Sequence, residues 1–75
     1  MSATPINRIA TGFATVTKID LNGFEAERLK AMGVFEGQTV ELSKGGNPVI
    51  LKAAGSRLAV ADDIACRILV DTNEQ

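Results

Sequence analysis

Two features of the sequence carry side chains that could do covalent or metal chemistry: one cysteine and one acidic pair. Cys66 is the only thiol among 75 residues, and the sequence contains no histidine that could act as its base. One cysteine also cannot form an internal disulfide, which excludes the class of small secreted proteins that disulfides hold together. We therefore interpret Cys66 as a small hydrophobic side chain, buried or half-buried.

The adjacent carboxylates of Asp62 and Asp63 are the weak candidates for a metal site. Ferrous iron and other divalent cations accept carboxylate ligands, but several usually converge, and intracellular selectivity usually needs imidazole or thiolate as well. Two neighbouring carboxylates supply at most one or two ligands, and the start of a short helix explains both charges equally well. We predict no metal site beyond these weak candidates, and no cofactor.

A pair of glycines, Gly45 and Gly46, resembles a phosphate-binding loop only superficially. Such a loop needs Gly-Lys-Ser or Gly-Lys-Thr at the start of a helix, whereas Asn47 and Pro48 lead into a strand here. We predict a turn at this position. Because no arrangement of nucleophile, base or metal ligands emerges from the sequence, we predict that the protein is not an enzyme.

Composition narrows the partners. Eight basic and nine acidic residues give a net charge of −1, and the only aromatic residues are three phenylalanines. Nucleic-acid binding usually relies on surplus positive charge and stacking aromatic platforms, so we predict no nucleic-acid partner. No apolar run approaches the roughly 20 residues of a membrane span, and the N-terminus lacks the layout of a signal peptide. We expect a cytoplasmic protein that meets a membrane only peripherally, through a partner.

The candidate residues must be positioned by short strands and one helix. Alternating polar and apolar residues, separated by turn signals, predict strands at 12–19, 38–44, 49–53, 57–61 and 67–71. A single helical turn is predicted at 62–65.

The helix is predicted over residues 22–33, between the first two strands. Asn22 is expected to cap its start, Glu25 to complete a capping box, and Gly33 to end it in a left-handed conformation. One face, which we expect to pack on the sheet, carries Ala26, Leu29 and Met32.

These elements favour a mainly β fold. A single open sheet of this size leaves both edges and one apolar face exposed, whereas a small closed barrel covers them. We predict an SH3-like five-stranded barrel with one α-helix inserted between the first two strands and a short helical turn before the last strand. Residues 1–75 are expected to form a single domain with its core at about 6–71, while residues 1–5 and 72–75 fray.

The order of motifs adds a family resemblance. LKAMGVFEG at 29–37 precedes a strand, GNPV stands at 46–49, an acidic turn ends in Ala65, and ILV at 68–70 closes the pattern. This order resembles the FeoA family, the small cytoplasmic ferrous-iron transport protein A, over roughly residues 6–71. The family-motif positions, which we interpret as structural, are Leu29, Met32, Gly33, Gly37, Gly46, Pro48 and Ala65.

The resemblance implies a function as well as a fold. Proteins similar to FeoA are accessory or regulatory partners of the membrane ferrous-iron transporter FeoB, which carries a cytoplasmic G-protein domain. Two departures from the family pattern stand out. Glu36 occupies a position where the family often has proline, and residues 61–63 (Ala-Asp-Asp) replace a run that is often rich in arginine and lysine.

The predicted partner site is an apolar cleft beside the helix, lined by Leu21, Phe24, Met32 and Phe35. Two other functions stay open at this point: an Fe(II) or divalent-metal chaperone that uses surface carboxylates such as Asp62 and Asp63, and a general SH3-like interaction module. Self-association is also open, because small barrels with apolar edges often pair with themselves.

Overall fold

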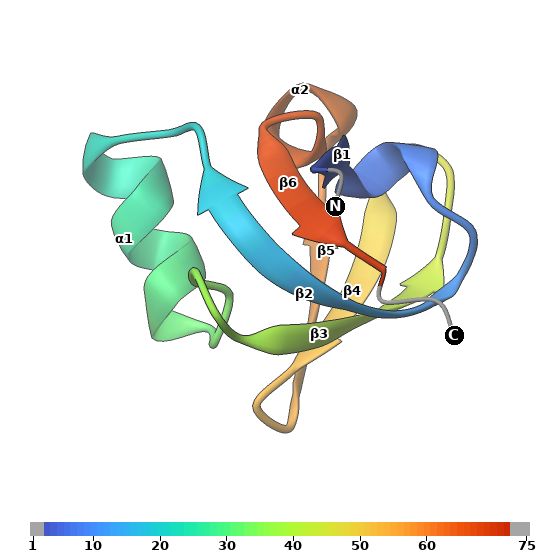
Figure 1. Cartoon of the computed structure of the whole chain (residues 1–75). Coiled ribbons are helices and arrows are strands. Elements are labelled where there is room, and N and C mark those ends of the chain that lie inside the picture. Colours follow the sequence, from blue (N-terminus) through green and yellow to red (C-terminus); the bar gives the residue numbers. More distant parts are fainter. Residues whose placement is uncertain (1–2, 73–75) are drawn as a thin grey trace.

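One antiparallel sheet organises the computed structural model, which describes residues 3–72. Within these residues six strands pair in the order β1-β6-β2-β3-β4-β5 (Figure 1). The strands are β1 (Thr4–Pro5), β2 (Gly12–Ile19), β3 (Thr39–Lys44), β4 (Val49–Ala53), β5 (Ser56–Val60) and β6 (Ile68–Asp71). The helical segments are the 3-10 helix η1 (Ile6–Arg8), α1 (Gly23–Ala31) and α2 (Asp62–Ala65).

The sheet curls because β2 serves two neighbours in succession. Its first half, residues 12–15, pairs with β3, and its second half, residues 15–19, pairs with β6. Register shifts between Val16 and Lys18, and between Leu42 and Lys44, mark irregularities in the β2–β6 and β3–β4 ladders. Such bulges bend a strand and strengthen its twist, so the sheet folds over its own apolar face.

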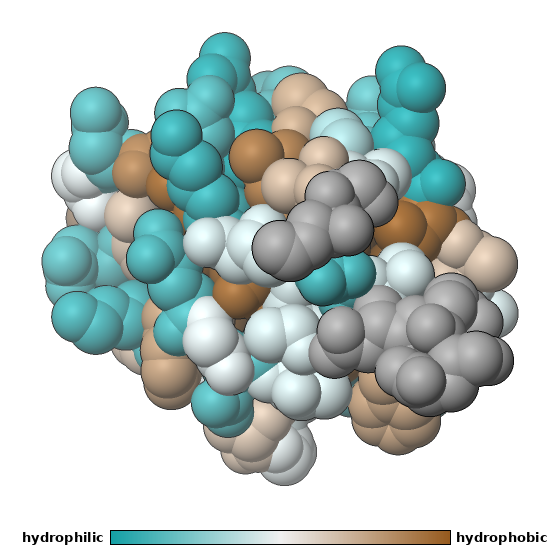
Figure 2. Space-filling view, viewed as in Figure 1, coloured by the Kyte–Doolittle hydropathy of each residue, from teal (hydrophilic) through white to brown (hydrophobic). Residues whose placement is uncertain are grey.

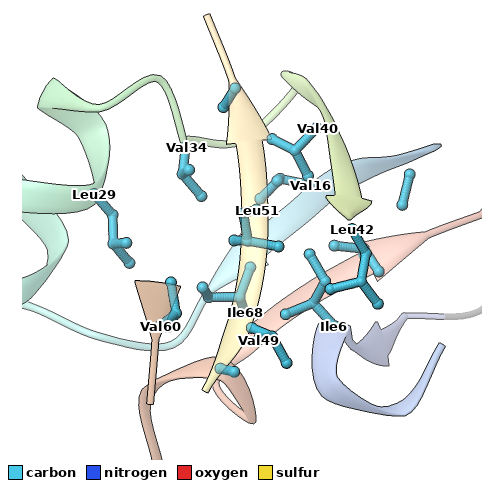
Figure 3. Packing of buried hydrophobic residues seen from close by; sticks show 14 of the residues in the cluster. Ile6, Val16, Leu29, Val34, Val40, Leu42, Val49, Leu51, Val60 and Ile68 are labelled. Atoms are coloured by element: carbon cyan, nitrogen blue, oxygen red, sulfur yellow. The ribbon is translucent and has the colours of Figure 1, made fainter. Parts of the chain in front are cut away.

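The concave face of this sheet encloses the core (Figure 3). Alternate residues of β3, β4, β5 and β6 are buried, as expected for strands with one face inward and one outward. The largest side chains with almost no exposure are Ile6, Leu42, Leu51, Ile68, Val16, Val34, Val40, Val49 and Val70. No charged or polar residue of the described chain is buried among them.

The structure confirms the predicted fold class, with two differences in detail. Thr4 and Pro5, which were expected to fray, form β1 against β6, and the following Ile6 is completely buried. The alternation rule missed this segment because two residues of strand and one turn of 3-10 helix are too short to show a period. The barrel is also not closed by hydrogen bonds, because within residues 3–72 no ladder joins β5 to β1.

Helix α1 lies at one side of the sheet, in the connection between β2 and β3 (Figure 1). Only Leu29 of its nine residues is buried. The prediction of a capping box was wrong, because Asn22 makes no side-chain cap bond, and Glu25 instead lies 3.6 Å from the Arg28 guanidinium. After the helix, Val34 N–H donates to the Leu29 carbonyl, and Gly37 N–H donates to the Val16 carbonyl of β2.

Candidate partner surface

A groove runs along α1 where the helix meets the end of β2 and the segment that leads to β3. Leu21 and Phe35, two of the four residues predicted to line a partner cleft, both contribute to it. Charged side chains stand among the apolar ones, and the complete lining is Ile19, Leu21, Ala26, Glu27, Lys30, Val34, Phe35 and Glu36. An apolar floor with a charged rim is the usual composition of a protein-binding patch. We call this depression the Phe35 groove.

The other two predicted residues lie elsewhere. Phe24 is 81% exposed on α1, five residues before Leu29, which puts it on the opposite side of the helix from the buried face. Met32 is partly buried against the core and serves to hold the end of α1. Neither residue lines the Phe35 groove. Of the four residues predicted to line one cleft, two therefore line the groove. Phe24 is exposed on another side of α1, and Met32 packs against the core.

Little hydrophobic surface is exposed in this region. Phe35 is 39% exposed, so only part of its side chain is accessible to a partner. Figure 2 shows a mosaic surface on the face seen in Figure 1, with hydrophilic side chains covering much of α1 and hydrophobic residues visible as separate small areas. An interface here needs a partner that inserts one or two apolar side chains rather than one that covers a broad flat patch.

The predicted partner site omitted a third exposed aromatic residue, Phe13. Phe13 of β2 is 67% exposed, next to the buried Ala14. The alternating pattern of β2 could have predicted this exposure, because Ala14 and Val16 face inward and position 13 must then face outward. Phe13 does not line the Phe35 groove, which makes it a matched control for experiments on Phe35.

The weak metal candidates occupy the first turn of α2, and one of them is already engaged. The Asp62 carboxylate accepts a hydrogen bond from Asn7 Nδ2 at 2.6 Å, and Asp62 N–H donates to Asn47 Oδ1 at 2.9 Å. These two bonds tie η1, the β3–β4 connection and α2 together. Among residues 3–72, no group of three or more Cys, Asp and Glu side chains is placed to hold a metal ion.

Cys66 is exposed, so the prediction of a buried or half-buried side chain was wrong. It follows the last residue of α2, and its Sγ donates to the Asp63 carbonyl at 3.3 Å. The neighbouring Ala65, by contrast, is completely buried. The prediction failed because α2 is a single turn, in which one position faces the core and the next faces outward.

The glycines and the proline of the family motifs lie at turns. Gly33 and Gly37 have φ of +92° and +89° and bracket the segment between α1 and β3. A Cβ built on Gly33 would lie 2.6 Å from the Cβ of Ala54, so the end of α1 approaches the β4–β5 turn as closely as backbone allows. Gly46, with φ of +103°, and Pro48 belong to the connection before β4.

Comparison with known protein families gives a match over nearly all of the described residues. The model of the FeoA domain family matches residues 5–72, whereas no curated protein matches the chain. In the part of the chain that the structure describes, no helix is long and apolar enough to span a membrane.

The solved structures that are similar to this chain include three FeoA or FeoA-like proteins. The crystal structure of an iron uptake regulatory protein (FeoA) has a TM-score of 0.75 and 25% identity, over 95% of this chain and 97% of that one. Iron(II) transport protein A from Clostridium thermocellum has a TM-score of 0.82 and 20% identity, over 92% of this chain and 45% of that one. An FeoA-like protein from Clostridium acetobutylicum has a TM-score of 0.78 and 18% identity, over 100% of this chain and 92% of that one. The two clostridial proteins support the fold alone.

Proposed function

The chain belongs to the FeoA family, and we propose that it serves ferrous-iron uptake as a small cytoplasmic accessory protein that binds the FeoB membrane transporter. Membership of the family implies a role in ferrous-iron transport. The observation that carries the proposal is the family match over residues 5–72, together with the likeness of nearly the whole chain to an iron uptake regulatory protein.

The character of the surface supports binding to a protein rather than handling of the metal. Carboxylates of the described chain do not converge into a set of three, and the Asp62 carboxylate already accepts the bond from Asn7. Apolar residues do converge, in the Phe35 groove. A protein partner gains from burying Leu21 and Phe35, whereas ferrous iron gains nothing from them.

The proposed contact is small. Standard stable interfaces bury about 1,600 Å² in total, and one groove with two apolar anchors supplies only the centre of such a patch. We therefore expect a transient complex in which Phe35 acts as the main anchor and the charges of Glu27, Lys30 and Glu36 set the orientation. Aromatic side chains at the centre of a contact usually carry the largest share of its binding energy.

The direct test is binding of the protein to the cytoplasmic G-protein domain of the transporter, measured by calorimetry or pull-down in each nucleotide state. Phe35→Ala is expected to weaken binding by about tenfold or more, because truncation of a hot-spot residue costs about 2 kcal/mol or more. Phe24→Ala examines the exposed aromatic residue of α1, which lies outside the Phe35 groove. Phe13→Ala, the matched control, is expected to bind like the parent protein.

Two outcomes would count against the proposal at different levels. Equal binding by the Phe35→Ala and Phe13→Ala proteins would remove the Phe35 groove from the interface while leaving the partner in place. No binding by the parent protein in any nucleotide state would reject the transporter domain as the partner.

A further inference from the structure

The two edges of the sheet are protected unequally. At one edge, β1 is two residues long and ends in Pro5, which has no N–H to offer. At the other edge, β5 is five residues long, contains no proline, and pairs only with β4 within residues 3–72. An edge strand of this length presents unpaired backbone groups to which another strand can add.

The register identifies which backbone groups of β5 are open. Ala53 pairs with Ser56 across a two-residue turn, in which Ala54 and Gly55 both have positive φ. The residues that flank such a turn exchange hydrogen bonds, so every second residue of β5 bonds to β4. The N–H and C=O groups of the two residues between, Arg57 and Ala59, therefore point away from β4.

These outward groups are accessible. Arg57 and Ala59 are both exposed. Within residues 3–72 no backbone bond from a loop or another element reaches either residue. Two N–H donors and two C=O acceptors, alternating along the edge, are what an incoming extended chain satisfies.

A groove lies beside this edge, between β5 and the two helices. Residues 58–61, which belong to β5 and the position after it, line one side of the groove. The other side is lined by Glu25, Arg28 and Leu29 of α1 and by Asp63 and Ile64 of α2. Leu29 reaches from α1 toward the region of Val60 and Ile68 (Figure 3), which gives the groove an apolar floor. Side chains that alternate along an added strand would point into this groove and away from it in turn.

Unpaired charges stand near both ends of the edge. Glu25 and Arg28 neutralise each other across 3.6 Å. The Asp63 carboxylate, at the α2 end, and the Arg57 guanidinium, next to the β4–β5 turn, have no ion pair in the part of the chain that the structure describes. An incoming strand with a basic residue near Asp63 and an acidic residue near Arg57 would complement both.

We propose that the β5 edge accepts an extended segment of a partner protein as an added strand, with a basic side chain facing Asp63 and an acidic side chain facing Arg57. This site is separate from the Phe35 groove, and the proposal does not depend on the identity of the partner that binds there. A second copy is the competing occupant, because antiparallel pairing of two β5 strands would also bring the Arg57 end of each copy toward the Asp63 end of the other. The test therefore separates self-pairing from binding of another protein.

The test uses the full chain labelled with ¹⁵N and a synthetic peptide of about seven residues, built of alternating valine and threonine with lysine at one end and glutamate at the other. Binding is followed by amide chemical shifts and by amide exchange of Arg57 and Ala59. Two further peptides carry N-methyl groups on one or the other alternate set of amides. Only the set that faces β5 supplies the ladder bonds, so one methylated peptide is expected to bind like the parent peptide and the other at least about tenfold more weakly.

Protein variants test the same site. Ala59→Pro removes an outward N–H that β4 does not use, and is expected to weaken peptide binding by about tenfold. Asp63→Lys should weaken binding of the peptide with lysine, and a peptide with glutamate in that position should restore it. If the Ala59→Pro protein fails to fold, the two methylated peptides still show whether the peptide forms ladder bonds with β5.

Four results would overturn the proposal. One is the absence of any shift at Arg57 and Ala59 with peptide at about 1 mM, a concentration that populates even very weak complexes. Another is equal binding by the two methylated peptides, which would exclude ladder bonds. The remaining two are shifts confined to the Phe35 groove, and a dimer of the protein alone that protects the Ala59 amide.

Discussion

The two helices of the molecule are held in opposite ways. Helix α2 has four residues, too few to be stable alone, yet Ala65 is completely buried and Asp62 is bonded to both Asn7 and Asn47. Helix α1 has nine residues, but it buries only Leu29 and its first turn lacks a side-chain cap. The shorter helix is fixed by tertiary contacts, and the longer one rests on the molecule at its C-terminal end.

The weaker attachment of α1 indicates which part of the surface can adapt to a partner. A segment with few buried contacts opens at a lower free energy than the core does, and surfaces that bind partners are often drawn from such segments. Both candidate partner grooves use α1 as a wall, and neither uses η1. The following substitutions examine that contrast.

The largest effect is expected from Ile6→Ala, which leaves a cavity beneath η1. Removing a fully buried aliphatic side chain costs about 2–5 kcal/mol, most of the roughly 5 kcal/mol that a domain of this size has. Leu29→Ala is expected to cost less, because α1 can settle into the space. Urea unfolding of both variants measures the difference, and equal losses would mean that α1 is packed as firmly as η1.

Gly33→Ala should destabilise the protein by about 2–3 kcal/mol and displace the end of α1. The left-handed backbone costs a residue with a side chain about 1–2 kcal/mol, and the added Cβ meets Ala54 at 2.6 Å. Gly37→Ala is the control, since its φ is similar but nothing lies within 4 Å of the new atom. If both variants lose the same stability, the close approach to Ala54 does not hold α1.

Asp62→Ala is expected to destabilise the α2 side by about 0.5–1 kcal/mol, because an exposed hydrogen bond to a charged group contributes little more. Asp62→Asn keeps an acceptor for Asn7 Nδ2 and should recover part of that loss. Asp63→Ala, whose carboxylate has no bond within the described chain, should cost less than Asp62→Ala. Thermal unfolding of the three variants ranks them, and a larger loss for Asp63→Ala would contradict the assignment.

The smallest effect is expected from Phe24→Ala. A side chain that is 81% exposed leaves no cavity when it is truncated, so the free energy of unfolding should change by no more than about 0.5 kcal/mol. Phe13→Ala, 67% exposed on β2, should behave alike. A loss above 1 kcal/mol for Phe24→Ala would show that α1 packs against more of the molecule than Leu29 and Met32 indicate.

Periodicity in the sequence was enough to predict the regular part of this fold. Strands β2 and β4 and helix α2 were predicted with the bounds observed, because alternation and turn residues mark them locally. The segment from Thr4 to Arg8 was missed, since its order comes from pairing with β6 and burial of Ile6. No local pattern of a few residues encodes contacts that lie more than sixty positions away.

The candidate site was predictable only in part. Leu21 and Phe35 were placed on one surface because both flank the helix, and they do share a groove. Phe24 was grouped with them by closeness in sequence, although its position on α1 turns it away from the buried face. The open edge of β5 could not be predicted, because a closed barrel was expected and which strands end unpaired depends on how far the sheet curls.

The position of β6 has a consequence for how the chain folds. Strand β6, the last strand within residues 3–72, lies between β1 and β2, so it becomes the second strand of the sheet rather than an edge. Val16 must find Val70, and Thr4 must find the same residue from the other side. Such distant pairing raises the contact order and slows folding compared with helical proteins of equal length. A chain cut before Ile68 would therefore lose the strand that joins β1 to β2, which leaves β1 and the second half of β2 without their hydrogen-bonding neighbour.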